Sequence, residues 1–206
     1  MIETTRPELV AYQGERLAKF VNENQKLDKG QIVFAGDSIT EFFALKKYLG
    51  REFPLVNRGI AGIDSVWLLE HLKEQVLDLE PSKLVLLIGI NDIGRGYPIR
   101  DIVTRISDII MTVRQESLFT EVYLLSVFPV SEESQYASKV KIRNNTTVGE
   151  LNQQLAVLPG VTYVDFFDYL TDSQGQLDSN YTTDGLHLSP QGYQVLAEPI
   201  IKEILE

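Results

Sequence analysis

Two short runs of almost unbroken Val, Leu and Ile constrain the fold of this chain more than any other feature: 83–89, KLVLLIG, and 121–128, EVYLLSVF. A strand with one face in water alternates apolar and polar residues, so unbroken apolar runs of this length indicate strands buried on both faces. Three further runs of strand character lie at 31–36, 54–58 and 161–165. Together they predict a parallel sheet of five strands covered by helices.

The segments between these runs repeat apolar residues at the spacing of a helix. Residues 99–113 carry one apolar stripe and residues 190–205 carry another, which predicts two helices packed against the sheet. A further helix is expected near 7–26, where Thr5 and Glu8 have the spacing of a capping box.

Strands and helices alternate along the whole chain, without repeats, low-complexity tracts or a linker. Right-handed crossovers then give a three-layer α/β/α sandwich with a flavodoxin-like strand order. We expect a single domain over residues 1–206. Sheets of this kind bind ligands beyond the carboxyl ends of their strands, so chemically useful residues should follow the strands.

The composition excludes several classes of partner. The 206 residues carry a formal net charge of −10, which argues against nucleic acid and anionic membranes as partners, because both bind cationic surfaces. The chain has no cysteine, so neither a disulfide nor a thiolate metal site can form. The amino-terminal stretch lacks a signal-peptide pattern, and no run of 18 apolar residues occurs, so a cytoplasmic location is expected. A homodimer stays open.

Polar residues or glycines follow four of the predicted strands, where the sheet should present its functional edge. These positions, in chain order, are Asp37 and Ser38, Gly59 and Gly62, Asn91 and Asp92, and Asp184 and His187. Their shared placement carries more weight than any one short motif.

Ser38 allows two readings. Ser38 and Glu41 have the spacing of a capping box, so Ser38 is expected at the start of a helix. A serine is also a nucleophile when a base accepts its proton. Of the two histidines, His71 lies inside a helical pattern, whereas His187 follows Asp184 by three residues. That carboxylate can orient the imidazole, so Ser38, His187 and Asp184 are predicted to form a catalytic triad.

Acyl transfer also needs donors for the oxyanion of its intermediate. Gly62 can offer a backbone N–H without a side chain in the way, and Asn91 can offer its side-chain NH₂. Each residue has an ordinary structural explanation as well, as a turn glycine and as the start of a helix. From these residues alone, that explanation is preferred for both.

Four blocks of the chain resemble those of the GDSL, or SGNH, esterase and acylhydrolase family. They are GDSI at 36–39, NRGIAG at 57–62, GIND at 89–92 and DGLH at 184–187. The resemblance implies a flavodoxin-like α/β/α fold and ester hydrolysis without a cofactor. It also implies that the Ser38 and Gly62 N–H groups and the Asn91 side chain form the oxyanion hole. The blocks look closest to the branch that includes platelet-activating-factor acetylhydrolase subunits.

Departures from the family pattern are small. Ile39 stands where leucine is usual, and Ile63 follows Gly62 where many relatives have aspartate. The second change puts an accessory hydrogen bond in doubt. Thr40 stands where a G-x-S-x-G elbow would need glycine, which argues against the ordinary α/β-hydrolase fold.

Two other functions remain as alternatives. One is a metal-dependent phosphoesterase, which would leave Ser38 and Gly62 without roles. Its candidate ligands are Asp37, Asp92, Asp184 and His187. The other is a flavodoxin-like module that binds a ligand or a partner protein without catalysis.

The physiological substrate is not readable from the sequence. Small, short-acyl esters are expected, because no exposed apolar run suggests bulk lipid. The segment 129–142 follows a strand and could act as a lid or as a surface loop. Candidates for contact with substrate are Asp37, Arg95, Tyr97 and Tyr136.

Overall fold

The computed structural model describes residues 2–206 and contains one parallel sheet of five strands in the order β2-β1-β3-β4-β5. This is the flavodoxin-like order, and it confirms the predicted fold class. The strands are β1 Ile32–Gly36, β2 Leu55–Gly59, β3 Lys83–Leu87, β4 Glu121–Leu125 and β5 Thr162–Val164. Each of them lies at its predicted place within a few residues.

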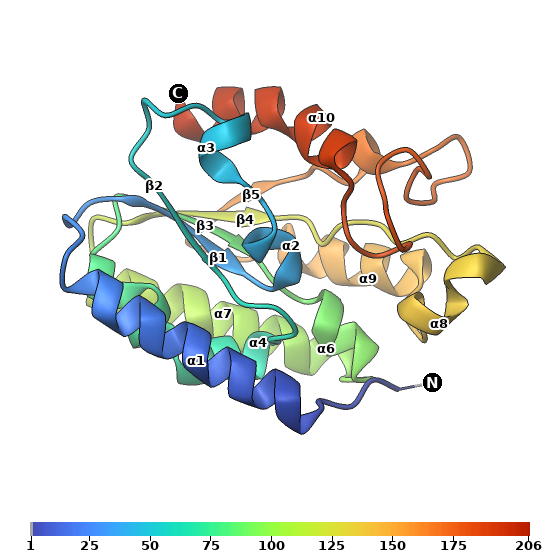
Figure 1. The fold of residues 1–206 in the computed structure, drawn as a ribbon, viewed down its shortest axis with the longest axis horizontal. Helices are drawn as coiled ribbons and strands as arrows, with labels where there is room; N and C mark the ends of the chain where they lie inside the picture. Colours follow the sequence, from blue (N-terminus) through green and yellow to red (C-terminus); the bar gives the residue numbers. More distant parts are fainter. Residues whose placement is uncertain (1) are drawn as a thin grey trace.

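Helices cover the sheet on both faces, and Figure 1 shows the three layers. Helices α10 and α3 lie on one face, and α1, α4, α7 and α9 lie on the other. The longer helices are α1 Pro7–Asn24, α7 Ile99–Glu116, α9 Asn145–Leu155 and α10 Pro190–Ile200. The short ones are α2 Ser38–Glu41, α3 Leu45–Tyr48, α4 Ser65–Glu70, α5 Leu72–Gln75, α6 Ile90–Gly94 and α8 Ala137–Val140. Single turns occur at η1 Leu77–Leu79, η2 Ser134–Tyr136, η3 Asp168–Leu170 and η4 Ile201–Leu205.

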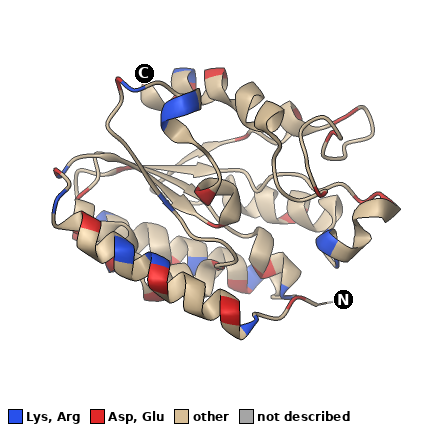
Figure 2. Cartoon of the chain, in the orientation of Figure 1, with Lys and Arg blue, Asp and Glu red and all other residues tan. Residues whose placement is uncertain are grey.

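The core forms where the apolar stripes meet the strands. All five residues of β1 are buried, and so are the stripe positions of α7, which are Ile102, Ile106, Ile109, Ile110 and Val113. Most charged residues lie on helices and loops, as Figure 2 shows. Arg58 on β2 is an exception at 2% exposure, and its guanidinium donates to Asn24 Oδ1 at 2.8 Å and pairs with Glu23 at 3.1 Å.

The structure differs from the prediction at two helix ends, those of α1 and α10. Thr5 does not cap α1, because Arg6 occupies the cap position without a side-chain bond and the Thr5 hydroxyl instead accepts from Arg95 at 3.0 Å. The helix predicted over 190–205 forms, but it is an α-helix only as far as Ile200 and continues as the π turn η4. No helix within residues 2–206 combines the length and the apolar character that crossing a bilayer requires.

Candidate active site

Ser38, His187 and Asp184 form a continuous hydrogen-bonded chain. Ser38 Oγ lies 2.9 Å from Nε2 of His187, and Nδ1 of the same ring lies 2.8 Å from Asp184 Oδ2. The other carboxylate oxygen of Asp184 accepts the backbone N–H of His187 at 2.8 Å. The carboxylate therefore holds both the ring and the backbone of the histidine in one orientation.

The fold brings these residues together from distant positions. Ser38 is the first residue of α2 and follows the buried strand β1, whereas His187 lies 149 positions later, in the loop before α10. Ser38 and the loop of His187 therefore meet at the carboxyl edge of the sheet, where the topology predicts a ligand site.

Asp37, and not Ser38, caps helix α2. The carboxylate Oδ1 of Asp37 accepts the N–H of Ile39 at 2.9 Å, so Ser38 is the first helical residue. Glu41 does not return to the cap, because its carboxylate accepts the N–H of Ala61 at 2.6 Å. The predicted Ser38–Glu41 capping box is therefore wrong, and the serine hydroxyl is left to face His187. The N–H of Ser38 also lies at the positive end of the helix.

The turn from Asp184 to His187 is fixed by a threonine and a glycine. The Thr182 hydroxyl donates to the His187 carbonyl at 2.7 Å and accepts the N–H of Gly185 at 2.9 Å. Gly185 has φ +81°, and a Cβ there would come 2.5 Å from Cβ of Tyr136. Only glycine fits this position, because Tyr136 packs directly against the turn from Asp184 to His187.

The electrostatics of the site keep His187 neutral. Burial lowers the pKa of His187, and the nearby charges of Lys139 and Arg143 act in the same direction. The hydrogen bond and charge of Asp184 oppose this without restoring the ordinary pKa. Burial alone would raise the pKa of Asp184, but the bonds from the backbone and ring of His187 hold it below its usual range. A neutral imidazole beside an ionised carboxylate is the arrangement that a general base requires.

Gly62 lies in the loop after β2 and has φ +75°, a left-handed conformation that favours glycine. Its carbonyl accepts from Arg95 at 2.8 Å, and the neighbouring Ala61 carbonyl accepts from Gln13 of α1 at 3.0 Å. Within residues 2–206, the N–H of Gly62 donates to no protein acceptor. The loop is thus held from both sides while this donor stays free.

Asn91, the second residue of α6, is buried, and its side chain has a defined orientation. Its Nδ2 donates to the Ile63 carbonyl at 2.8 Å, and its Oδ1 accepts from Arg143 at 2.9 Å. A primary amide carries two N–H donors, so one of them is left after the bond to Ile63.

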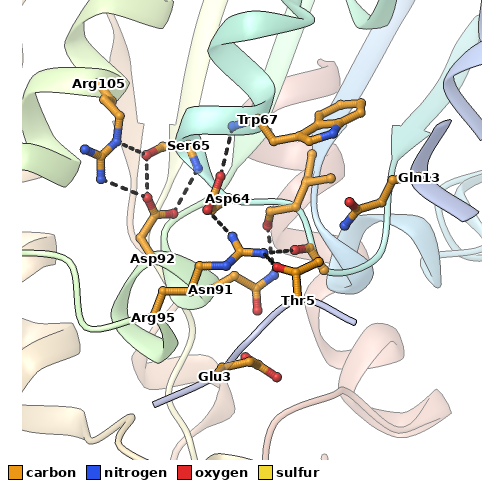
Figure 3. A network of polar contacts seen from close by, with 12 residues as sticks. Glu3, Thr5, Gln13, Asp64, Ser65, Trp67, Asn91, Asp92, Arg95 and Arg105 are labelled. Atoms are coloured by element: carbon orange, nitrogen blue, oxygen red, sulfur yellow. Dashed lines mark hydrogen bonds and ion pairs between the residues drawn. The ribbon is translucent and has the colours of Figure 1, made fainter. Parts of the chain in front are cut away.

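Two ion-pair groups join the loop of Gly62 to the helix of Asn91, as Figure 3 shows. Asp64 caps α4 by accepting the N–H of Trp67 at 2.9 Å, and it also pairs with Arg95. Asp92 accepts the N–H of Ser65 at 3.0 Å and pairs with Arg105 at 3.3 Å. The loop of Gly62 and helix α6 are therefore connected through buried polar contacts.

The substrate-contact candidates lie in different places. Asp37 is 0% exposed, one of its carboxylate oxygens has no hydrogen-bond partner among residues 2–206, and burial raises its pKa to about 7. The Arg95 guanidinium is occupied by Asp64, Thr5 and the Gly62 carbonyl. Tyr97 lies under the Arg105 guanidinium at 4.9 Å. Of the four candidates, Tyr136 is the one that packs against the turn from Asp184 to His187.

The structure places three further residues at or behind this constellation that the sequence analysis did not select. The Phe42 ring lies 5.4 Å from the His187 ring and is 52% exposed. Lys139 lies 3.5 Å from Asp184, and Arg143 contacts Asn91. A signal was present only for Phe42, which lies one helical turn after Ser38.

Segment 129–142, for which the sequence leaves a lid and a surface loop open, packs against the turn from Asp184 to His187 and contains η2 and α8. The N–H of Ser131 donates to the Gly185 carbonyl at 2.9 Å, and the Val130 carbonyl accepts from Leu177 at 3.1 Å. Within residues 2–206, no three His, Asp or Glu side chains are grouped so that they could hold a metal ion. The ligand set of the phosphoesterase alternative is split, because Asp92 faces Ser65 and Arg105 rather than His187.

Comparisons with known proteins agree on one family. The model of the GDSL-like lipase/acylhydrolase family matches residues 34–195. A solved Streptococcus pneumoniae structure described as a platelet activating factor is 37% identical with a TM-score of 0.90, and the match covers 96% of this chain and 94% of that one.

Two curated relatives are more distant. The human isoamyl acetate-hydrolyzing esterase 1 homolog is 27% identical over 195 residues, covering 81% of this chain and 77% of that protein. The N-acylneuraminate cytidylyltransferase of Escherichia coli O18:K1:H7 is 28% identical over 172 residues, covering 82% of this chain. The match spans 39% of the length of that protein.

Proposed function

The chain belongs to the GDSL-like lipase/acylhydrolase family and is a serine ester hydrolase, and we propose that Ser38, His187 and Asp184 are its catalytic triad. The observation that carries this proposal is the 2.9 Å approach of Ser38 Oγ to His187 Nε2, with Asp184 on the far ring nitrogen. Neither the metal-dependent nor the non-catalytic alternative is favoured.

In the first step, Ser38 Oγ attacks the acyl carbonyl while His187 Nε2 accepts the serine proton. The imidazolium is stabilised by Asp184 and returns the proton to the leaving alcohol. Water, deprotonated by the same imidazole, then attacks the acyl-enzyme, the bond from the acyl carbon to Ser38 Oγ breaks, and the imidazolium returns its proton to Ser38 as the acid is released. None of these steps needs a metal or an organic cofactor.

The negative charge on the carbonyl oxygen needs donors that are already in place. The N–H of Ser38 at the start of α2, the free N–H of Gly62 and the second amide N–H of Asn91 are proposed to supply them. The Ser38 N–H lies at a helix end, and the Gly62 N–H lies in a left-handed turn. The Asn91 side chain is held by hydrogen bonds at both its oxygen and its nitrogen. The three donors come from segments that follow three different strands.

The substrate is proposed to be a small ester with a short acyl chain. Phe42 and Tyr136 border the triad, and segment 129–142 is bonded to the histidine turn. The human relative is named for hydrolysis of isoamyl acetate, an ester of a short acid, which agrees with this proposal. A cytoplasmic location remains a prediction from the sequence, which leaves a homodimer open.

The test compares wild type, Ser38→Ala and Ser173→Ala, which removes an exposed serine as a matched control. Each protein is assayed on p-nitrophenyl acetate, butyrate and octanoate and is treated with a fluorophosphonate probe. We expect Ser38→Ala to lose about 10³-fold or more in kcat and all labelling, while the control keeps both. Labelling of Ser38→Ala at the wild-type rate would refute the assignment of the nucleophile. Faster turnover of octanoate than of acetate would refute the short-acyl proposal.

A further inference from the structure

Arg143 is a buried charged residue to which the proposed mechanism gives no role. It is 2% exposed, its Nη2 donates to Asn91 Oδ1 at 2.9 Å, and its Nε donates to the Ile90 carbonyl at 2.9 Å. We propose that Arg143 is a positioning residue that sets which end of the Asn91 amide faces the substrate, and that Glu3 of the amino-terminal segment holds Arg143 in place. This inference rests on the proposed role of Asn91 as an oxyanion donor.

The amide of an asparagine has two ends of nearly equal shape, so packing alone does not choose between them. If the amide were turned over, its oxygen would face the oxyanion and repel it. A guanidinium has only donors and therefore accepts no N–H partner, so Arg143 selects the orientation in which Oδ1 faces it. The Ile63 carbonyl, on the other side, selects the same orientation because it only accepts.

The charge of Arg143 also strengthens the donor. A cation beside Oδ1 draws electron density from the amide, and hydrogen bonds in series polarise one another in a buried site. The effect is felt most when negative charge develops on the substrate oxygen. Loss of Arg143 should therefore lower kcat more than it changes KM.

Glu3 reaches this site from the beginning of the chain. Its carboxylate pairs with Arg143 and, at 3.1 Å, with Lys141, while its N–H donates to the Gly94 carbonyl at 2.8 Å. Arg143 itself packs directly against Gly94, because a Cβ at that position would clash with its guanidinium. Glu3 lies outside residues 34–195, so this anchor comes from a segment that the family match does not include.

A second contact of the same segment supports this reading. Thr5 accepts from Arg95, as Figure 3 shows, and Arg95 in turn donates to the Gly62 carbonyl. The amino-terminal segment thus contacts Arg143, which bonds to Asn91, and Arg95, which bonds to Gly62. Asn91 and Gly62 are the two proposed oxyanion donors outside α2. Substitutions at Glu3 should act on kcat although Glu3 touches no reacting atom.

The experiment is a double-mutant cycle between Arg143→Met and Asn91→Ala, with kcat and KM measured on p-nitrophenyl acetate and melting temperature measured for each protein. Asn91→Ala alone should lose on the order of 10²-fold in kcat. Arg143→Met alone should lose roughly 10-fold or more in kcat with KM little changed. In the Asn91→Ala background, Arg143→Met should cost no more than about 2-fold, since its target is gone. Arg143→Lys, which keeps the charge and a donor, should recover part of the loss.

Glu3→Gln tests the same coupling if Arg143→Met does not fold. It should lower kcat by a few-fold in the wild-type background and leave kcat unchanged in Asn91→Ala. Glu8→Gln, which removes an exposed carboxylate of α1, serves as the matched control and should leave kcat unchanged.

Equal losses of kcat from Arg143→Met, or from Glu3→Gln, in the two backgrounds would overturn the inference while leaving the oxyanion role of Asn91 intact. Wild-type kcat in Asn91→Ala would refute that oxyanion role and the inference with it. Fluorophosphonate labelling of Ser38→Ala does not depend on Asn91 or Arg143. It therefore distinguishes a failure of the nucleophile assignment from a failure of this inference.

Discussion

The ammonium nitrogen of Lys139 lies 3.5 Å from Oδ2 of Asp184, the carboxylate oxygen that also faces Nδ1 of His187. Lys139 is on α8, in the segment 129–142 that packs against the turn from Asp184 to His187. A positive charge at this place disfavours the imidazolium form of His187 and weakens the pull of Asp184 on its proton. The segment therefore contributes to the acid–base properties of the proposed triad.

The pH profile of kcat/KM should reflect this arrangement. Burial, Lys139 and Arg143 together place the pKa of His187 below its ordinary value of 6.5. The base is active when neutral, so activity should be full above that pKa and should fall as pH drops through it. We expect the midpoint of the fall in kcat/KM at acid pH, the acid limb of the profile, to lie below pH 6.5. A limb above that value would contradict the lowered pKa.

Lys139→Gln should move the acid limb toward higher pH. Removing the positive charge makes the imidazolium easier to form, which raises the pKa of His187. Lys139 is partly exposed, so the shift between the two proteins should shrink as salt increases. Lys202→Gln, an exposed lysine on η4, is the control and should leave the limb in place. An unmoved limb in Lys139→Gln at low salt would show that this ion pair does not act on the base.

Asp184→Asn should separate orientation of the ring from folding of the turn. An asparagine can still accept the backbone N–H groups of Leu186 and His187 through its oxygen, but it offers no negative charge to the imidazolium. We expect kcat to fall by roughly 10³–10⁴-fold with little change in melting temperature. Asp184→Ala should lose similar activity and also lower the melting temperature. Nearly normal kcat in Asp184→Asn would remove Asp184 from the triad.

Gly62→Ala should lower both stability and kcat. The φ of +75° costs a residue with a Cβ about 1–2 kcal/mol, and this Cβ would meet Leu9 at 2.6 Å. Gly175→Ala is a matched control, because Gly175 has φ +73° and open space around it. Chemical denaturation should show a loss for both variants, whereas only Gly62→Ala should lose kcat. Equal kcat in the two variants would argue against an oxyanion role for Gly62.

Phe42→Ala should change acyl selectivity rather than the chemistry itself. The half-exposed ring beside His187 limits the space next to the scissile bond. Its removal should raise kcat/KM for butyrate relative to acetate by about 10-fold. Phe119→Ala, which removes a 95% exposed ring next to the amino end of β4, should leave this ratio unchanged. A fall of the whole ester series by one factor would mean that Phe42 supports the triad instead.

The outline of the fold could be predicted because it depends on patterns that repeat locally. Unbroken apolar runs such as 83–89 can be buried only as strands with both faces covered, and stripes such as that of 99–113 suit one helical face. Once the strands were placed, the ends of β1 and β3 located Ser38 and Asn91. The same reasoning failed for single contacts. Capping by Thr5 or Ser38 is compatible with the sequence, yet Thr5 meets Arg95 and Ser38 meets His187.

The sequence by itself determined the five strands, their helical cover and the edge at which polar residues collect, because burial and periodicity are properties of neighbouring residues. Only the tertiary structure decided which partner each buried polar group has. Arg143 meets Asn91 across 52 positions and Glu3 across 140, and no local pattern links them. A buried charge is stable only with the partners that packing brings within reach, so these contacts exist once the loops and the amino-terminal segment have closed on the sheet.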